Sequence, residues 1–279
     1  ANTHYCSRPT NLDRGFVHYE DFPTNWRQVI SHSRLFSVVN KTYGGLSAIG
    51  IYENLPRKGA RKVGDDFLNW LDDRPQQRPF FAFLNFLDAH SPYLPERLVD
   101  EDREMSREEK LFMKNWDFVI PSQASEEQLQ LARSAYRSKI HEVDAHIGHL
   151  LKELDSRGLR DNTIIIVTSD HGELFGEHGT CYHGNSLYRP VVHVPLMISW
   201  PGHVPAGRRV ETPVSLRDLA ATVLDLTQPN GQPQLPGHSL RVTRDRDADP
   251  AARISVPYAM SSVHPNVEGR AVFRESPSI

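Results

Sequence analysis

The feature that most constrains the fold is an uninterrupted run of apolar and β-branched residues, Thr163-Ile164-Ile165-Ile166-Val167-Thr168. β-branched side chains are stiff about their first torsion and favour extended backbone. A strand-length run without polar alternation is typical of a parallel strand that helices cover on both faces. The run therefore predicts a central parallel strand in an α/β fold.

Helical segments alternate with further apolar runs, which is the pattern of a layered α/β fold and disfavours all-helical and all-β ones. Residues 61–71 predict one helix, and residues 125–157 predict a longer one that Gly158 ends. Its apolar side chains recur at three- and four-residue spacing on one face: Leu131, Ile140, Val143, Ile147, Leu150, Leu151 and Leu154.

The remaining elements follow the same alternation. The apolar run 79–86 predicts a strand buried on both faces, and 194–200 predicts another strand. Residues 215–226 predict a helix with Ser215 as its cap. The charged stretch 96–125 predicts a surface excursion over the site.

One large domain is the simplest organisation. Residues 1–241 are expected to form it, and 242–279 are expected to be its peripheral C-terminal segment, since Pro, Gly, Asp and Arg dominate from Gln228 onward. At 279 residues the chain can bury a substantial core.

Charge and cysteine content exclude several classes of function. The chain has 32 basic and 35 acidic residues, a net charge of −3, so a nucleic-acid-binding surface is not expected. Cys6 and Cys181 are too few for a disulfide framework and lack the spacing of a zinc knuckle. No apolar run reaches the roughly 18 residues that a membrane span needs.

Polar clusters follow two of the predicted strands. Asp170 and His171 come directly after the run 163–168, where a carboxylate and an imidazole can both turn toward a cation beyond the strand end. The alternative is that Asp170 caps a following helix and His171 is an ordinary loop histidine.

Three further histidines lie close to these strand ends in the predicted fold. His90 follows the run 79–86 and is placed to contact an anionic ester or to protonate a departing oxygen, or else to hydrogen bond within a turn. His178 and His183 lie in a glycine-rich loop, where one of them would face the anion and the other would tie down the loop.

Three stretches together resemble the sulfatases of the alkaline phosphatase superfamily. They are Phe80 to Tyr93 with H-x-P-Y, Ile164 to Tyr188 with S-D-H-G-E and G-E-H-G, and Arg189 to Gly202 with V-P-L-x-I-x-W-P-G. Leu12 to Phe16 and Val214 to Ala220 also look like sulfatase segments. The resemblance implies that 1–241 form a sulfatase-like catalytic domain, an alkaline phosphatase-like layered sandwich in which helices flank a central, mostly parallel sheet.

The resemblance also implies roles for individual residues. Asp170 and His171 would be two ligands of one divalent cation, usually calcium in sulfatases, although the imidazole leaves manganese, magnesium and zinc open. His90 would contact the sulfate or assist leaving-group departure. His183 falls where many sulfatases place a sulfate-binding lysine, so His90 and His183 are the expected catalytic residues.

The beginning of the chain departs from the sulfatase pattern. Sulfatases attack with a formylglycine made from Cys or Ser in a C-x-P-S-R motif, and further acidic metal ligands come from an N-terminal strand. Cys6-Ser7-Arg8-Pro9-Thr10 has the wrong order, so Cys6 is set aside. The N-terminal part of the fold, with the nucleophile that a formylglycine-generating enzyme would mature, is expected upstream of Ala1.

These observations predict a metal-dependent sulfuric ester hydrolase that, when complete, cleaves the sulfate monoester of a small molecule or glycan. Tetrahedral sulfate and phosphate are easily confused, so a phosphodiesterase, phosphonate hydrolase or phosphoglycerol transferase of the same superfamily is the alternative. An inactive truncated fragment is a further one.

Overall fold

The computed structural model describes residues 6, 8–21, 52, 57–184, 186–227 and 235–240. The chain divides into two compact units, the first comprising Ala1–Ile166 with Glu173–Tyr182 and the second Val167–Gly172 with His183–Ile279. The predicted peripheral segment 242–279 lies outside the described residues, so its assignment stays a prediction.

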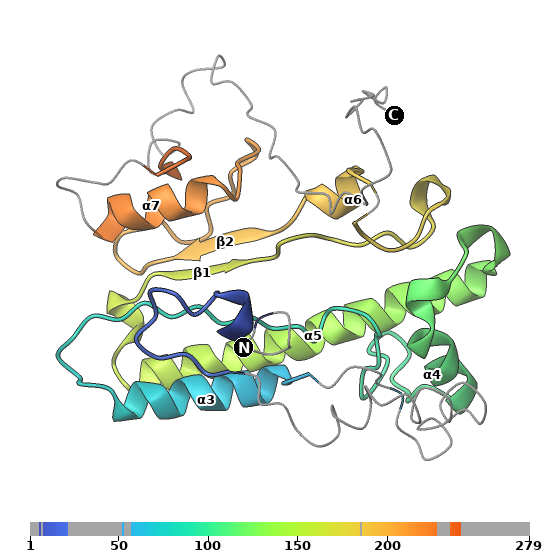
Figure 1. Cartoon of the computed structure of the whole chain (residues 1–279), viewed down its shortest axis with the longest axis horizontal. Coiled ribbons are helices and arrows are strands. Elements are labelled where there is room, and N and C mark those ends of the chain that lie inside the picture. Colours follow the sequence, from blue (N-terminus) through green and yellow to red (C-terminus); the bar gives the residue numbers. More distant parts are fainter. Residues whose placement is uncertain are drawn as a thin grey trace. The chain divides into compact units, whose positions relative to one another are not determined.

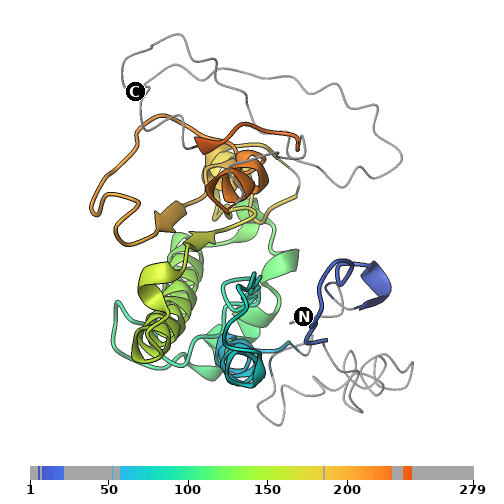
Figure 2. The same cartoon turned by 90° about the vertical axis from the view of Figure 1, so that its left-hand side faces the viewer.

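Two helices, α3 (Ala60–Asp73) and α5 (Glu126–Ser156), lie side by side in the first unit (Figures 1 and 2). Both confirm helices predicted from the apolar spacing. Gly64 permits their close approach, because a Cβ there would lie 3.3 Å from Leu150 Cδ2. The buried side chains between them are Phe67, Leu68, Leu71, Leu150 and Leu154.

The ends of α5 follow directly from its sequence. The Ser125 hydroxyl accepts a hydrogen bond from the Gln128 backbone N–H, and the Gln128 side chain accepts one from the Ser125 N–H. This capping box satisfies two donors that the first helical turn leaves unpaired. Gly158 ends the helix with φ +65°, a conformation that glycine adopts without strain.

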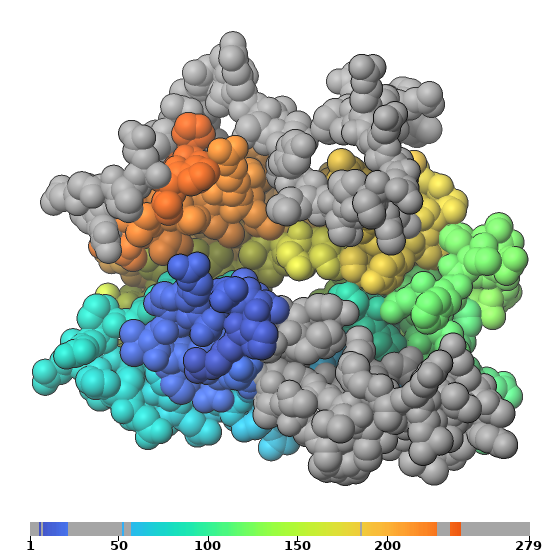
Figure 3. All heavy atoms as spheres, in the orientation of Figure 1, coloured from blue at the N-terminus to red at the C-terminus, as the bar shows by residue number. Residues whose placement is uncertain are grey.

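Residues 79–86 differ from the prediction of a strand buried on both faces. The segment forms no assigned strand, and only one side is covered, by the α3 and α5 cluster. The side chains of Phe81 and Phe83 are 64% and 71% exposed. Phe81 contacts Phe16, with ring centroids 6.0 Å apart, and Figure 3 shows residues 8–21 in blue against this part of the unit.

The charged stretch 96–125 is more than a surface excursion. It contains α4 (Arg107–Lys114) with the short 3-10 turns η4 (Trp116–Phe118) and η5 (Pro121–Gln123). Some of its charged side chains form ion pairs within the stretch, such as Arg103 with Glu101 and Glu109, and Asp100 pairs with Arg137 of α5. The side chains that it contributes to a buried cluster with Tyr93 and Phe175 are Leu98, Met105, Met113 and Trp116.

The second unit contains β2 (Leu196–Ser199), α6 (Arg189–Val192) and α7 (Asp218–Thr227), and the strand β1 (Ile165–Thr168) runs into it from the first unit. β1 and β2 form a two-stranded sheet. Both strands lie within the predicted runs, and a helix forms in the predicted region. It begins at Asp218, so Ser215 is not its cap as predicted; the Ser215 hydroxyl accepts from the Arg217 N–H in the turn before α7.

The described part of the fold is thus a mixture of helix and sheet. Its two strands do not amount to the predicted central, mostly parallel sheet. The first three residues of β1 are half-buried and Thr168 is exposed, so the strand is not covered on both faces. Among the described residues, every helix is too short or too polar to span a bilayer.

Candidate active site

Asp170 and His171 follow β1 directly, as predicted. His171 Nδ1 lies 2.8 Å from the Gly172 carbonyl oxygen, which can only accept, so Nδ1 carries the proton and Nε2 the lone pair. Nε2 lies 3.7 Å from Asp170 Oδ1. The lone pair on His171 Nε2 and the carboxylate oxygen of Asp170 therefore suit a divalent cation. A metal-binding imidazole usually donates its other N–H to a carbonyl or carboxylate, as Nδ1 does here.

The structure excludes one of the two interpretations of Asp170, the helix cap. Its Oδ1 accepts a hydrogen bond from the His171 backbone N–H at 3.0 Å. No helix begins between residues 171 and 176, so Asp170 is not a helix cap. Its side chain is 89% exposed, compared with 34% for that of His171, and it can therefore meet a ligand without rearranging the core.

Gly172 fixes the backbone immediately after these two residues. Its N–H donates to the Val191 carbonyl oxygen at 2.7 Å, at the end of the α6 turn. A Cβ at this position would lie 2.0 Å from the Pro190 carbonyl oxygen, far inside contact distance. Only glycine fits here, which explains the glycine in the S-D-H-G-E motif.

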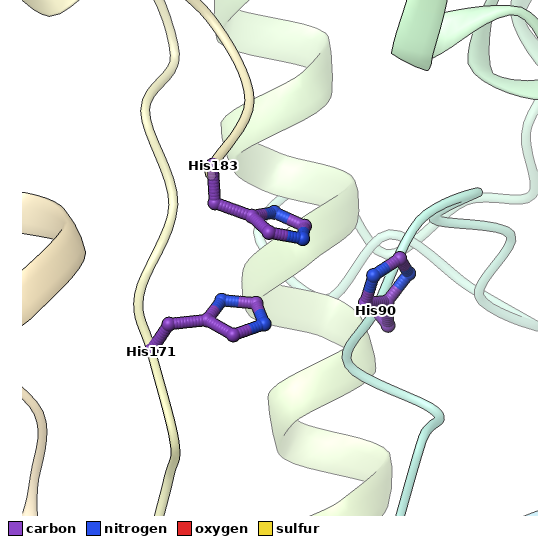
Figure 4. A group of neighbouring side chains, drawn as sticks. All are labelled: His90, His171 and His183. Carbon is purple, nitrogen blue, oxygen red and sulfur yellow. The ribbon is translucent and has the colours of Figure 1, made fainter. Parts of the chain in front are cut away.

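His183 lies beside His171 in the second unit. Their rings are stacked with centroids 3.9 Å apart and an interplanar angle of 22° (Figure 4). His178, the other histidine of the loop, is exposed and has a left-handed φ of +56° in the short turn η7 (Glu177–Gly179). Of the two alternatives, His183 is the one whose ring packs on a predicted metal ligand.

His90 lies in the first unit, in a turn that Arg57 holds. The Arg57 guanidinium donates to the carbonyl oxygens of Leu87 and His90 at 2.9 Å and of Pro92 at 3.1 Å. The Nδ1 atom of His90 (labelled in Figure 4) lies 3.0 Å from the Ser91 carbonyl oxygen. Sequence reasoning missed Arg57, and nothing in the local sequence marks it.

Tyr93 and Glu173 form a buried hydrogen bond in the first unit that was also missed. The Tyr93 hydroxyl donates to Glu173 Oε2 at 2.5 Å. Burial, followed by the negative charge of Glu173, raises the pKa of Tyr93 far above its ordinary value, so Tyr93 stays a donor. Tyr93 is the last residue of the H-x-P-Y motif, and Glu173 is the last residue of the S-D-H-G-E motif. Membership of these motifs was the sequence signal that could have singled them out.

The two cysteines are free thiols. Burial raises the pKa of Cys181 to about 11, so its thiolate is scarce at neutral pH. Cys6 Sγ accepts from the Asn85 side-chain amide at 3.4 Å. Its exclusion as the nucleophile stays a prediction.

A large groove in the second unit begins at Asp170 and His171 and continues along β2. Apolar side chains such as Val194, Leu196 and Trp200 line it, together with the cations Arg189 and Arg217. Carboxylates also line it, namely Asp170, Glu211 and Asp225.

Comparisons with known proteins identify the family. A family model described as "Sulfatase" matches residues 5–229. The zebrafish (Danio rerio) arylsulfatase K is 37% identical over 143 residues, 50% of this chain and 26% of that protein. The rat (Rattus norvegicus) steryl-sulfatase is 30% identical over 187 residues, 63% of this chain and 27% of that protein. The chain thus spans about a quarter of the length of these curated relatives.

A solved structure is also similar. The phosphonate monoester hydrolase SpPMH from Silicibacter pomeroyi superposes with a TM-score of 0.52 at 25% sequence identity. The superposition covers 80% of this chain and 52% of that one.

Proposed function

The chain belongs to the sulfatase family, and from this we propose that it supplies the metal-binding and proton-transferring side of an active site that hydrolyses sulfate monoesters. One observation carries the proposal. Asp170 Oδ1 and His171 Nε2 lie 3.7 Å apart directly after β1, with His183 stacked on His171. This is an oxygen and a nitrogen donor beside a third polar side chain, and the first two residues line a groove.

Asp170 and His171 would hold one divalent cation, which supplies positive charge to the ester oxygens. Calcium is the ion that the family resemblance favours. Because the pair includes an imidazole, manganese, magnesium and zinc also suit the donors. The further acidic ligands and the formylglycine nucleophile, with the enzyme that matures it, would belong to other sequence of the natural protein.

The chain's own histidines would handle the substrate. With Nδ1–H held by the Ser91 carbonyl, Nε2 of the doubly protonated His90 would give its proton to the departing oxygen and leave the neutral imidazole. His183 would donate to sulfate oxygens in the position where many sulfatases use lysine. The substrate would be a small-molecule or glycan sulfate ester.

The half-covered strands support a proposal about the complete fold. We expect further strands of the natural protein to extend the sheet of β1 and β2 into a central, mostly parallel sheet flanked by helices. Residues 1–241 would then be one catalytic domain with 242–279 at its periphery.

The test uses the full-length natural protein. It should hydrolyse 4-nitrophenyl sulfate, lose this activity when a chelator removes divalent metal, and regain it when calcium or manganese is added. Activity that survives complete metal removal would overturn the metal-dependent mechanism. No turnover of any sulfate monoester with metal present would overturn the proposed reaction.

A phosphonate monoester hydrolase is the second candidate, because the structure from S. pomeroyi superposes on 80% of this chain. Rates on 4-nitrophenyl sulfate and on the 4-nitrophenyl monoester of phenylphosphonate, measured with the same enzyme preparation, separate the two. A higher kcat/KM for the phosphonate would favour this candidate.

A further inference from the structure

We propose that Tyr93 and Glu173 are a positioning pair, whose hydrogen bond ties the turn that carries His90 to the residue that follows the metal-binding sequence. The inference rests on the proposed function, because it concerns the same active site. Tyr93 comes three residues after His90, and Glu173 comes two residues after His171. The hydrogen bond joins residues 80 positions apart in the chain.

The pair is built into the core of the first unit. Tyr93 is 0% exposed and Glu173 is 8% exposed. Two aromatic rings pack against the ring of Tyr93, with centroids 5.2 Å (Tyr136) and 5.8 Å (Phe175) from its own. A carboxylate in such surroundings is costly unless hydrogen bonds compensate it. Glu173 Oε2 accepts from Tyr93, and Oε1 accepts from the Leu174 N–H at 3.2 Å.

The backbone between His90 and Tyr93 is held stiffly. Arg57 donates to the carbonyl oxygens of His90 and Pro92, one on each side of Ser91, which is itself buried. A displacement of the Tyr93 ring is therefore not absorbed by a loose loop. Because Arg57 holds this turn, a displacement of Tyr93 would also change the position of His90.

The backbone between His171 and Glu173 is equally constrained. Gly172 is the single intervening residue, and its N–H is bonded to the Val191 carbonyl at 2.7 Å. Pro190 leaves no room at Gly172 for even a Cβ. A shift of Glu173 therefore strains the residue that sets the orientation of the His171 ring through its carbonyl oxygen.

Neither member of the pair is proposed to touch substrate or metal, so their effect is indirect. Partners that orient metal ligands from outside typically change metal affinity or activity by about 10- to 100-fold when they are removed. A pair that only stabilises the core would change the resistance to unfolding and leave kcat and metal affinity unchanged.

The experiment compares Tyr93→Phe with Tyr136→Phe in the full-length natural protein. Tyr136 belongs to the same aromatic cluster, and its substitution by Phe removes the same hydroxyl. Among the described residues, the hydroxyl that donates to Glu173 is that of Tyr93 and not that of Tyr136, which makes Tyr136→Phe a matched control. Calcium and manganese affinity by titration calorimetry, and kcat and KM for 4-nitrophenyl sulfate, are measured for each. We expect Tyr93→Phe to lower metal affinity or kcat by about 10-fold and Tyr136→Phe to change neither more than about two-fold.

Two substitutions of Glu173 complete the test. Glu173→Gln retains an oxygen that accepts from Tyr93, whereas Glu173→Leu does not. We expect Glu173→Gln to retain several-fold more activity than Glu173→Leu, and Tyr93→Phe to add little to the effect of Glu173→Leu. Additive losses would overturn the idea that the two residues act as a pair.

The remaining outcomes are separable from those of the proposed function. If Tyr93→Phe matches Tyr136→Phe in kcat and metal affinity, or lowers only the resistance to denaturant, the positioning role is wrong. If the wild type turns over no ester but binds metal, the proposed reaction fails, and the metal affinities of the two tyrosine variants still decide the positioning role. A wild type without turnover or metal binding overturns both.

Discussion

The segments around His90 and Asp170 both follow apolar runs, yet they are held in different ways. In residues 87–93, Arg57 satisfies three backbone carbonyls, and Tyr93 is fully buried. Asp170 is oriented by its neighbour's backbone N–H, and its side chain is 89% exposed. The chain thus holds the turn that carries His90 in place, whereas the carboxylate of Asp170, the proposed metal ligand, stays in water and avoids the desolvation cost of a buried anion.

The largest expected effect on kcat/KM comes from Asp170, the exposed residue of the two. Asp170→Ala should remove an oxygen ligand and lower kcat/KM by about 1,000-fold, because a bound metal contributes several kcal/mol of charge stabilisation. Steady-state kinetics over a range of calcium and manganese concentrations would measure it. Asp161→Ala, at an exposed carboxylate in the 3-10 turn η6 (Arg160–Asn162), should change kcat/KM less than two-fold.

Near-normal turnover of Asp170→Ala would show that the exposed carboxylate has no role in catalysis, and the contrast with the His90 turn would then have no functional meaning. Partial recovery at high metal concentration would sharpen it, because it would identify weakened binding as the cause.

The next effect concerns His90 itself. His90→Gln should lower kcat by about 100-fold through the loss of proton transfer to the leaving oxygen. The loss should be larger for an alkyl or sugar sulfate than for 4-nitrophenyl sulfate, because nitrophenolate departs without a proton. His141→Gln, an exposed histidine on α5, is the control. An equal loss for all leaving groups would instead assign His90 to contact with the sulfate.

Arg57 tests whether the bracing of the His90 turn has a functional consequence. Arg57→Lys retains the charge but not the planar fork that reaches three carbonyls, so kcat should fall by about 10-fold. The free energy of unfolding should fall by about 1–3 kcal/mol. Arg61→Lys, with a side chain 85% exposed, should do neither. Unchanged kcat with reduced stability would show that the bracing is structural only.

The smallest effect is expected at His183. A lysine stays protonated through the neutral range, so His183→Lys should raise kcat/KM a few-fold above pH 7 by strengthening the bond to sulfate oxygens. pH profiles of kcat/KM for the wild type and the variant would measure it. The same change at exposed His178 should leave the profile unchanged. A loss of activity would mean that the His171–His183 stack itself is required.

The sequence alone determined the elements whose causes are local. The capping residues and apolar spacing of α5, the glycine that ends it, the two short strands and the Asp170-His171 pair after β1 depend on neighbours a few residues away. The motifs also identified the family. They did not reveal which of His178 and His183 stacks on His171.

The tertiary structure decided what depends on distant partners. Arg57 reaches carbonyls 30 to 35 positions further along the chain, and Tyr93 finds Glu173 across 80 positions. The covered face of 79–86 and the buried side chains of 96–125 likewise depend on the helices packed against them. Local spacing cannot encode such pairings, because they arise only when folding brings separate segments to one place and each buried polar group must then find a partner.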